Sequence, residues 1–205
     1  MTLSTSGTGT VIAAALVAVV CFAIGGVNPA TAVGRSQGVD VATVGSGNPG
    51  ATNLGRVLGR KWGIAVGVLD VLKGLVPTLV VQLTLGTWLA LVGGAACVLG
   101  HIYSPYLAGR GGKGVATSLG AMLAVAPWVA LAGLVVFLLA LPFVKRLGDA
   151  SVLATTALVT LGVVLTVRAE HTVGRGVGVW VTLLSLLVLA RHRRNILAWV
   201  GRLRG

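Results

Sequence analysis

The sequence predicts an all-α fold: a polytopic membrane helix bundle of about seven transmembrane helices, with the N-terminus outside and the C-terminus cytoplasmic. Hydrophobic residues make up 56% of the 205 residues and charged residues only 10%. A soluble domain carries roughly a quarter of charged residues. Seven apolar runs approach the length of a membrane-spanning helix, and basic residues gather in short segments between alternate runs.

The first predicted span covers residues 10–30. The small residues Ala30, Thr31 and Ala32 that follow its apolar part imitate the cleavage site of a signal peptide. No Lys or Arg precedes Arg35, however, so the basic segment that begins a signal peptide is missing. We therefore interpret this run as a retained first span.

Six further apolar runs follow, at residues 62–84, 86–104, 114–127, 127–144, 150–167 and 176–190. The fourth and fifth predicted spans meet at Pro127 with hardly any loop, so a single broken span is the alternative to two. Small residues such as Gly93, Gly94 and Gly120 are plentiful and allow helices to pack closely in a membrane. No internal repeat is evident, which disfavours a transporter built from duplicated halves.

The basic residues predict the topology. With seven spans and the N-terminus outside, thirteen of the 16 basic residues fall inside, while Arg168 and Arg175 fall outside and Lys73 lies within a span. This asymmetry in short loops is typical of the positive-inside rule. The same clusters produce the net charge of +12, and because they separate apolar runs, nucleic acid is excluded as a partner. The chain is then one integral membrane domain, residues 1–205, with a short cytoplasmic tail at 191–205.

The first inside loop, residues 45–53, contains a literal G-x-G-x-x-G pattern, with Asp70 twenty residues beyond it. A dinucleotide site is excluded because no βαβ unit surrounds the pattern. A plain hairpin would explain glycine, proline and asparagine, but polar side chains are concentrated here and predict a functional loop. They are Ser46, Asn48, Thr52, Asn53 and Arg56.

Asp70 and Lys73 stand three residues apart in the second predicted span and so share one helix face. Ionisable groups at membrane depth are costly and usually face an interior cavity or pair with each other. Two interpretations stay open. One is a mutually satisfied structural pair, and the other is a functional pair whose lysine reaches the aqueous side by snorkelling.

Residues 109–114, Gly-Arg-Gly-Gly-Lys-Gly, directly precede the fourth predicted span. Glycines ahead of a helix expose backbone N–H groups, and the helix N-terminus carries partial positive charge. Because Arg110 and Lys113 add two formal charges, we expect an anion-binding cradle, with a basic topology loop as the alternative. It is not a Walker loop, since Gly114 follows the lysine where Ser or Thr should stand.

Metal and cofactor sites are not indicated. The histidines His101, His171 and His192 are far apart without Cys or carboxylate nearby, so no metal is expected. None of them begins an H-x-x-x-x-D motif, so the His/Asp pair of acyl-CoA acyltransferases is absent. Cys21 and Cys97 lie in apolar runs and are interpreted as buried hydrophobic residues.

Four segments occur in order between residues 29 and 196. They are Ser46–Asn53 (SGNPGATN), Leu69–Gly74 (LDVLKG), Gly100-His101 with Gly111–Thr117 (GGKGVAT), and His192–Ile196 (HRRNI). In this order they resemble the bacterial acyl-phosphate:glycerol-3-phosphate acyltransferases of the PlsY family. The resemblance implies a seven-span enzyme of the bacterial inner (cytoplasmic) membrane whose active face is cytoplasmic.

That resemblance implies transfer of an acyl chain from acyl phosphate to the 1-hydroxyl of glycerol 3-phosphate, giving lysophosphatidate and phosphate in phospholipid biosynthesis. The expected partners are these two substrates and membrane lipid, and no cofactor is implied. Two alternatives stay open. One is a membrane transporter or binding protein for a phosphorylated or anionic solute, and the other is an inactive paralogue that keeps the fold.

Carried over position by position, the resemblance assigns Ser46, Asn48 and His101 to catalysis. The substrate-binding set is Asn53, Arg56, Lys73, Lys113, Ser151, His192 and Asn195. The chemistry is attack of an alkoxide-like oxygen on a mixed anhydride, in which positioning and charge stabilisation supply most of the catalysis. The base stays open between His101, Asp70 and a phosphate oxygen of the substrate.

The chain departs from the family pattern at a few positions. Ser104 stands where proline is usual and Pro105 comes one residue later, while Gly109 replaces an aromatic residue. Arg110 stands where lysine is usual, and Ala198 where an arginine is expected. These changes leave the expected phosphate-binding set intact.

Overall fold

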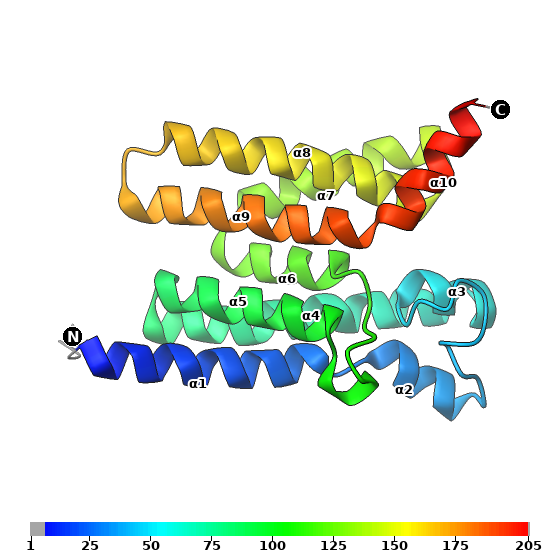
Figure 1. The fold of residues 1–205 in the computed structure, drawn as a ribbon, viewed down its shortest axis with the longest axis horizontal. Helices are drawn as coiled ribbons and strands as arrows, with labels where there is room; N and C mark the ends of the chain where they lie inside the picture. The colour runs from blue at the N-terminus through cyan, green and yellow to red at the C-terminus, as the bar shows by residue number, and fades with distance from the viewer. Residues whose placement is uncertain (1–6, 205) are drawn as a thin grey trace.

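The computed structural model describes residues 7–204, and within that range it is helical with no β-strand (Figure 1). The predicted all-helical membrane fold is therefore confirmed. In chain order the helices are α1 (Gly7–Gly26), α2 (Pro29–Ser36), α3 (Ala51–Leu58), α4 (Arg60–Leu85), α5 (Thr87–Ile102), the 3₁₀ helix η1 (Pro105–Leu107), α6 (Val115–Val125), α7 (Pro127–Val144), α8 (Leu147–Arg168), α9 (Thr172–Arg191) and α10 (Arg193–Arg204).

The fourth predicted span, residues 114–127, folds as a helix that is too short to cross a membrane. α6 has 11 residues and is about 16 Å long, whereas a hydrocarbon core is about 30 Å thick. Within the described part of the chain, six other helices have the length and apolar composition of a span. Because α6 ends before Ala126 and Pro127 opens α7, the fourth and fifth predicted spans are two separate helices.

Close contact with α4 holds α6 inside the bundle. A Cβ atom at Gly74 of α4 would overlap the backbone carbonyl of Thr117, and one at Gly120 of α6 would overlap the carbonyl of Val71. Only glycine at both positions lets the two backbones approach this closely, which is how helices associate where no hydrophobic force drives them together. The contact fixes the N-terminus of α6 deep in the bundle beside α4.

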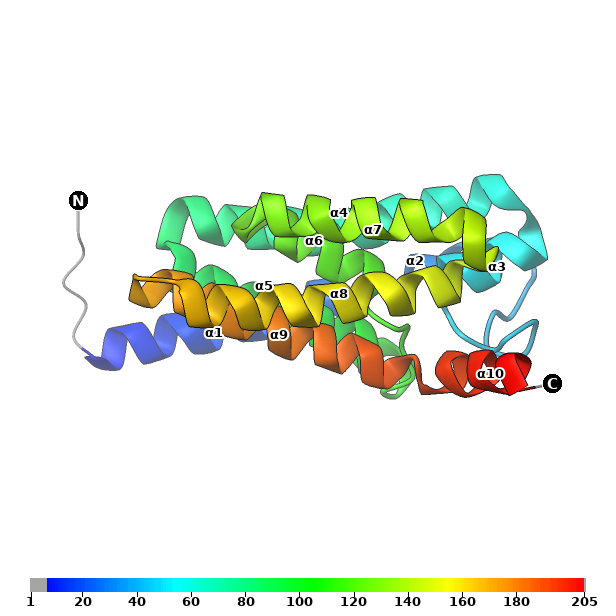
Figure 2. The ribbon, with the colours of Figure 1, turned by 90° about the horizontal axis from the view of Figure 1, so that it is seen from above.

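The connections between the long helices separate into two ends of the bundle (Figures 1 and 2). One end holds the start of α1 and the α4–α5 and α8–α9 turns. The opposite end holds α2, α3, η1, the α7–α8 turn and α10. The segments that the sequence placed inside therefore lie together at one end, and most of the basic residues lie with them.

The outer surface of the bundle is apolar, as expected for helices in lipid. Large side chains such as Leu83 and Phe143 are exposed, while Trp180 is buried in a core shared by α5, α6 and α9. Cys21 and Cys97 are free and buried, which confirms their interpretation as buried hydrophobic residues. Polar side chains are nevertheless buried inside the bundle, among them Asp70, Lys73 and His101, and they require an explanation.

Candidate functional site

A cavity of about 260 Å³ lies at the basic end of the bundle, and we refer to it as the inner cavity. It brings together nine of the ten residues that the sequence singled out, although they come from five separate regions of the chain. The nine are Ser46, Asn48, Asn53, Arg56, His101, Lys113, Ser151, His192 and Asn195. The tenth, Lys73, is not in the cavity wall.

Three helices begin at the inner cavity. Residues of the first turns of α3, α6 and α8 line it: Ala51, Thr52, Val115, Ala116, Leu147 and Gly148. The first N–H groups of a helix lack partners within the helix, and the end carries partial positive charge. Three such ends around one cavity make a strong anion site, which no single sequence motif indicated.

Asn53 shapes the first loop of the cavity wall. Its Oδ1 accepts a hydrogen bond from the backbone N–H of Ser46 (2.8 Å), and its Nδ2 donates to the carbonyls of Val44 (3.0 Å) and Val41 (3.2 Å). Both amide protons are therefore used within the protein, and the side chain is only 1% exposed. Asn53 holds Ser46 in place and leaves the Ser46 hydroxyl exposed at the cavity.

The glycine-rich loop offers fewer free N–H groups than the sequence suggested. Gly111 N–H donates to the Ile102 carbonyl and Gly112 N–H to the His101 carbonyl, both at 3.0 Å. These bonds cap the C-terminal end of α5. The N–H groups of Gly109 and Arg110 also donate to backbone carbonyls, so four amides of the expected cradle are structural and the expectation is corrected. What remains at the cavity is the start of α6 at Gly114 and the side chain of Lys113.

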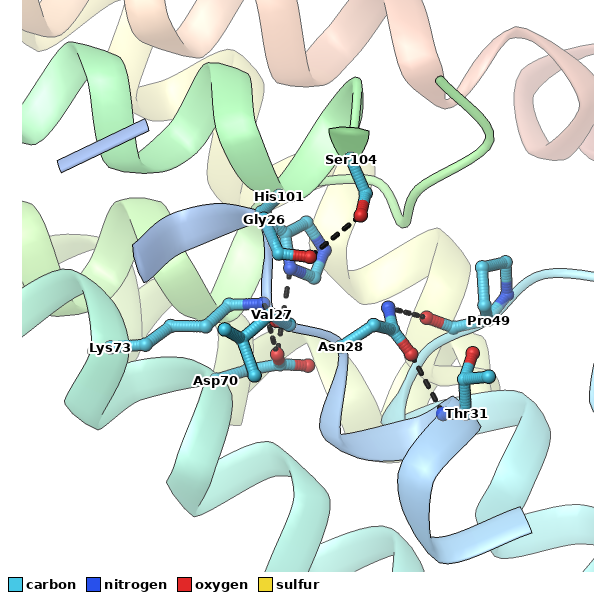
Figure 3. Close-up of polar contacts among 9 residues, drawn as sticks. All are labelled: Gly26, Val27, Asn28, Thr31, Pro49, Asp70, Lys73, His101 and Ser104. Carbon is cyan, nitrogen blue, oxygen red and sulfur yellow. Dashed lines mark hydrogen bonds and ion pairs between the residues drawn. The ribbon is translucent and has the colours of Figure 1, made fainter. Parts of the chain in front are cut away.

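A buried network adjoins the inner cavity (Figure 3), and its Asp70 is part of the cavity wall. Lys73 Nζ lies 2.9 Å from Asp70 Oδ1 and donates to the Val27 carbonyl at 2.7 Å. Ser104 Oγ donates to the Gly26 carbonyl at 2.6 Å. Lys73 and Ser104 thus satisfy carbonyls that α1 leaves free where it ends. Of the two interpretations of Asp70 and Lys73, the structure favours the structural pair.

Asp70 also supports His101, which lies between the network and the cavity. His101 Nδ1 is 3.5 Å from Asp70 Oδ1, and its Nε2 packs so closely on Gly112 that a Cβ there would overlap the ring. The imidazole is 4% exposed. Nδ1 therefore faces Asp70, while Nε2 lies beside Gly112 in the cavity wall without a hydrogen bond to the protein, and His101 packs the glycine-rich loop against α5.

Asn28 connects the end of α1 to the first loop. Its Oδ1 accepts from Thr31 N–H (2.7 Å) and caps α2, while its Nδ2 donates to the Pro49 carbonyl (2.9 Å) (Figure 3). The sequence analysis did not single out this residue. Asn28 followed by Pro29 is the usual signal for a helix start, and it marked the α1–α2 break within the first predicted span.

Lys113 and His192 are titratable groups of the cavity, and burial lowers the pKa of each. Burial lowers the pKa of the Lys113 ammonium and repulsion from Arg56 lowers it further, while Asp149 partly offsets both. Lys113 Nζ donates to Asn195 Oδ1 at 2.5 Å. Burial also lowers the pKa of His192, whose Nδ1 bonds the Val188 carbonyl at 2.8 Å. A carbonyl only accepts, so Nδ1 carries a proton and Nε2 is left for a ligand.

Asp149 and Arg202 were not singled out from the sequence, and they fix the last helix against the site. Their ion pair joins the first turn of α8 to α10. Asp149 is 3% exposed. Asn195 packs against the same turn, because a Cβ at Gly148 would overlap its side-chain amide. The pair therefore holds α10, and with it Asn195, over the inner cavity.

An apolar chamber of about 180 Å³ adjoins the inner cavity. The two share Val115, Ala116, Phe137 and Ser151, and the chamber continues between α6, α7, α8 and α9. An anion-binding cavity that opens into an apolar chamber suits a molecule with a charged head and an apolar tail. Among residues 7–204 there is no group of three His, Cys, Asp or Glu side chains placed to hold a metal ion.

This chain is similar to proteins of one enzyme family. Residues 15–201 match the family described as glycerol-3-phosphate acyltransferase. The glycerol-3-phosphate acyltransferase of Anaeromyxobacter dehalogenans strain 2CP-1 is 45% identical over 166 residues, covering 78% of this chain and 79% of that protein. The corresponding protein of Geobacter sulfurreducens is 39% identical over 180 residues, with coverages of 86% and 89%.

Solved structures are similar over a greater share of the chain. The crystal structure of PlsY, an integral membrane glycerol 3-phosphate acyltransferase, in its glycerol 3-phosphate form has a TM-score of 0.82 and 35% identity. Its lysophosphatidic acid form has a TM-score of 0.80 and 34% identity. Both comparisons cover 92% of each chain.

Proposed function

The chain belongs to the glycerol-3-phosphate acyltransferase family, and on this premise we propose that it transfers an acyl chain from acyl phosphate to the 1-hydroxyl of glycerol 3-phosphate. The products are lysophosphatidate and inorganic phosphate. One observation carries the proposal: a cavity lined by Arg56, Lys113 and the first turns of three helices adjoins an apolar chamber. Both substrates carry phosphate, and one of them also carries an acyl chain.

The phosphate groups are bound by side chains that have spare donors. Arg56 and Lys113 supply charge, and Asn195 supplies a neutral N–H. The Ser151 hydroxyl donates to the Leu147 carbonyl and can accept from a protonated phosphate, and His192 Nε2 donates only when the ring is protonated. Charge-assisted hydrogen bonds of this kind are about twice as strong as neutral ones. Lys73 is outside this set because Asp70 and the Val27 carbonyl occupy its ammonium. Asn53 acts through Ser46, as described above.

The reaction replaces one acyl–oxygen bond by another. The 1-hydroxyl oxygen of glycerol 3-phosphate bonds the carbonyl carbon, the carbon–oxygen bond to phosphate breaks, and phosphate leaves with the electron pair. Ser46 and Asn48 are the neutral donors assigned to the reacting centre. We assign the hydroxyl proton to a phosphate oxygen of the substrate and give His101, whose Nδ1 faces Asp70, a positioning role.

The acyl chain is assigned to the apolar chamber. Ser151 and Phe137 stand at its junction with the inner cavity, so the carbonyl carbon would lie at the polar end with the chain among Leu134, Leu158 and Met122. Burial of each methylene contributes about 0.8 kcal/mol. This arrangement places the mixed anhydride where the two cavities meet.

We place the protein in the bacterial inner membrane with the inner cavity facing the cytoplasm, the N-terminus outside and the C-terminus inside. The clustering of basic residues at the cavity end supports this orientation. Residues 1–205 are proposed as one domain; residues 1–6 and Gly205, the last residue of the proposed tail at 191–205, lie outside the described residues. Accessibility labelling of cysteines introduced at positions 48 and 113 tests the orientation, because both must react from the cytoplasmic side.

The activity is tested with purified protein, acyl phosphate and glycerol 3-phosphate, with lysophosphatidate measured by mass spectrometry. Lys113→Ala should lower turnover about 100- to 1,000-fold, the usual effect of removing one donor to developing charge. Lys61→Ala is the matched control, since Lys61 is exposed at the same end and lines neither cavity. Solute binding without product formation by the wild-type protein would instead indicate a transporter or an inactive paralogue.

A further inference from the structure

A second polar cavity, of about 450 Å³, lies outside the inner cavity and has no part in the proposed reaction. We refer to it as the outer vestibule. It is joined to the inner cavity, because Ser46, Asn48, Lys113 and Asn195 line both. Four arginines complete its wall: Arg110, Arg191, Arg193 and Arg194.

These arginines have no acidic partner among residues 7–204. Asp70 and Asp149 pair with Lys73 and Arg202, and no ion pair in this range includes an arginine of the vestibule. No carboxylate lines the vestibule. Arg191 packs over the ring of Tyr103 at 5.8 Å, while the other three arginines are exposed. The wall therefore carries concentrated positive charge that the protein does not neutralise.

A cleft lined by charge of one sign raises the local concentration of oppositely charged ligands and speeds their capture. Guanidinium groups match phosphate in particular, because their N–H groups form paired hydrogen bonds with its oxygens. Lys113 lines both cavities and so stands where the vestibule adjoins the inner cavity. The lining has few apolar residues, of which Pro49 and Ala190 are examples, so a soluble phosphate ester fits it better than a lipid.

We propose that the outer vestibule is a second, weaker anion site that captures the phosphate group of soluble glycerol 3-phosphate and passes it to the inner cavity. The choice of ligand rests on the proposed function. The site is weaker than the inner cavity because its arginines are exposed and screened by salt. The acyl phosphate takes a different route, through the apolar chamber.

A double variant, Arg193→Gln with Arg194→Gln, removes two of the four charges from residues that do not line the inner cavity. At low ionic strength the KM for glycerol 3-phosphate should rise about tenfold, while kcat and the KM for acyl phosphate change less than twofold. The difference in the KM for glycerol 3-phosphate between the double variant and the wild-type protein should shrink in high salt. The matched control, Arg60→Gln with Lys61→Gln, removes the same charge from an exposed helix start at the same end.

An equal KM change in the control would overturn the proposal, because the effect would then come from overall charge. A rise in the KM for acyl phosphate equal to that for glycerol 3-phosphate would also overturn it. The kinetics are measured in neutral detergent and in vesicles containing phosphatidylglycerol. If the double variant differs from wild type only in the vesicles, the vestibule binds a lipid headgroup and the proposed ligand is wrong.

Equilibrium binding of inorganic phosphate provides a test that does not depend on turnover. Arg56 lines only the inner cavity, so Arg56→Ala protein should retain phosphate binding at the vestibule, and adding Arg193→Gln and Arg194→Gln should lower its affinity for phosphate. Equal binding by these two variants would contradict a second site. If wild-type protein makes no lysophosphatidate but this pattern of phosphate binding is found, the proposed function fails and the anion site stands.

Discussion

Lys73 and Lys113 are both lysines at the basic end of the bundle, yet their surroundings are opposite. Lys73 is held by Asp70 and by the Val27 carbonyl, so its charge is neutralised within the protein. Lys113 bonds only the neutral Asn195, lies near Arg56, and has a lowered pKa. One lysine belongs to a closed network that holds α1, α4 and α5 together. The other has charge to spare for a ligand.

Whether a polar residue has a partner within the protein distinguishes structural residues from ligand-binding ones more clearly than residue type does. Asp70, Lys73, Ser104 and Asn28 satisfy one another or backbone groups at the end of α1. The inner cavity and outer vestibule instead collect cations that lack acidic partners. These cations are exposed or only partly buried, so their charge stays available to an anion.

The largest expected difference is between Lys73→Met and Lys113→Met. Lys73→Met leaves Asp70 buried without its cation, which should destabilise the protein by about 3–5 kcal/mol. Lys113→Met should cost at most about 1 kcal/mol, the value of one hydrogen bond, yet lower kcat about 100- to 1,000-fold. Thermal unfolding in detergent and turnover are measured for both variants. If Lys73→Met and Lys113→Met lost equal stability, the assignment of Lys73 to the fold and of Lys113 to ligand binding would be wrong.

Arg202 gives a smaller effect because its side chain is partly exposed. Arg202→Met leaves Asp149 unpaired, and water compensates in part, so we expect a loss of about 1–2 kcal/mol. Turnover should fall several-fold because α10 carries Asn195. Adding Asp149→Asn should restore most of the stability, which a double-mutant cycle measures. Additive losses in that cycle would show that the ion pair does not hold α10.

Ser104→Ala isolates one bond of the closed network. It removes the donor to the Gly26 carbonyl, and because Ser104 is fully buried, we expect a loss of about 1 kcal/mol. Ser36→Ala is the control, since Ser36 makes the same kind of bond to the Val33 carbonyl at an exposed position. Unfolding free energies that fall equally in both variants would argue against a special role for the α1 end.

The smallest expected effect is the pH dependence that His192 contributes. Its pKa is lowered in the folded protein, so the unfolded chain binds more protons near that pH and stability rises with pH. This contribution is complete above the unfolded value of about 6.5 and is lost as pH falls toward the folded pKa. His192→Gln should flatten the pH profile of unfolding below about pH 7. Identical pH profiles of unfolding for the wild-type and His192→Gln proteins would show that His192 does not contribute to the pH dependence.

Nine of the ten residues indicated by the motifs lie in the wall of the inner cavity, so residue identity and order located the site well. They did not separate groups that face a ligand from groups that serve the fold. Asn53 and Asn195 are both motif asparagines, but both amide protons of Asn53 bond loop carbonyls, while Asn195 faces Lys113. Which partner an amide takes depends on distant segments.

One departure from the family pattern is explained by such a distant contact. Ser104, where proline is usual, uses its hydroxyl to satisfy the end of α1, 78 residues away in the chain. Nothing in the structure explains Ala198, where an arginine is expected.

Hydropathy, charge clustering and ordered motifs by themselves determined that this protein is a helical membrane bundle, that its polar residues gather at one end, and which family it belongs to. These are local properties of the chain, and lipid allows few other ways to satisfy its backbone. The tertiary structure alone decided that α6 is a half-length helix, that three helix N-termini meet, and which cations lack partners. These features depend on contacts between residues far apart in the chain, such as Lys113 with Asn195, which no local pattern encodes.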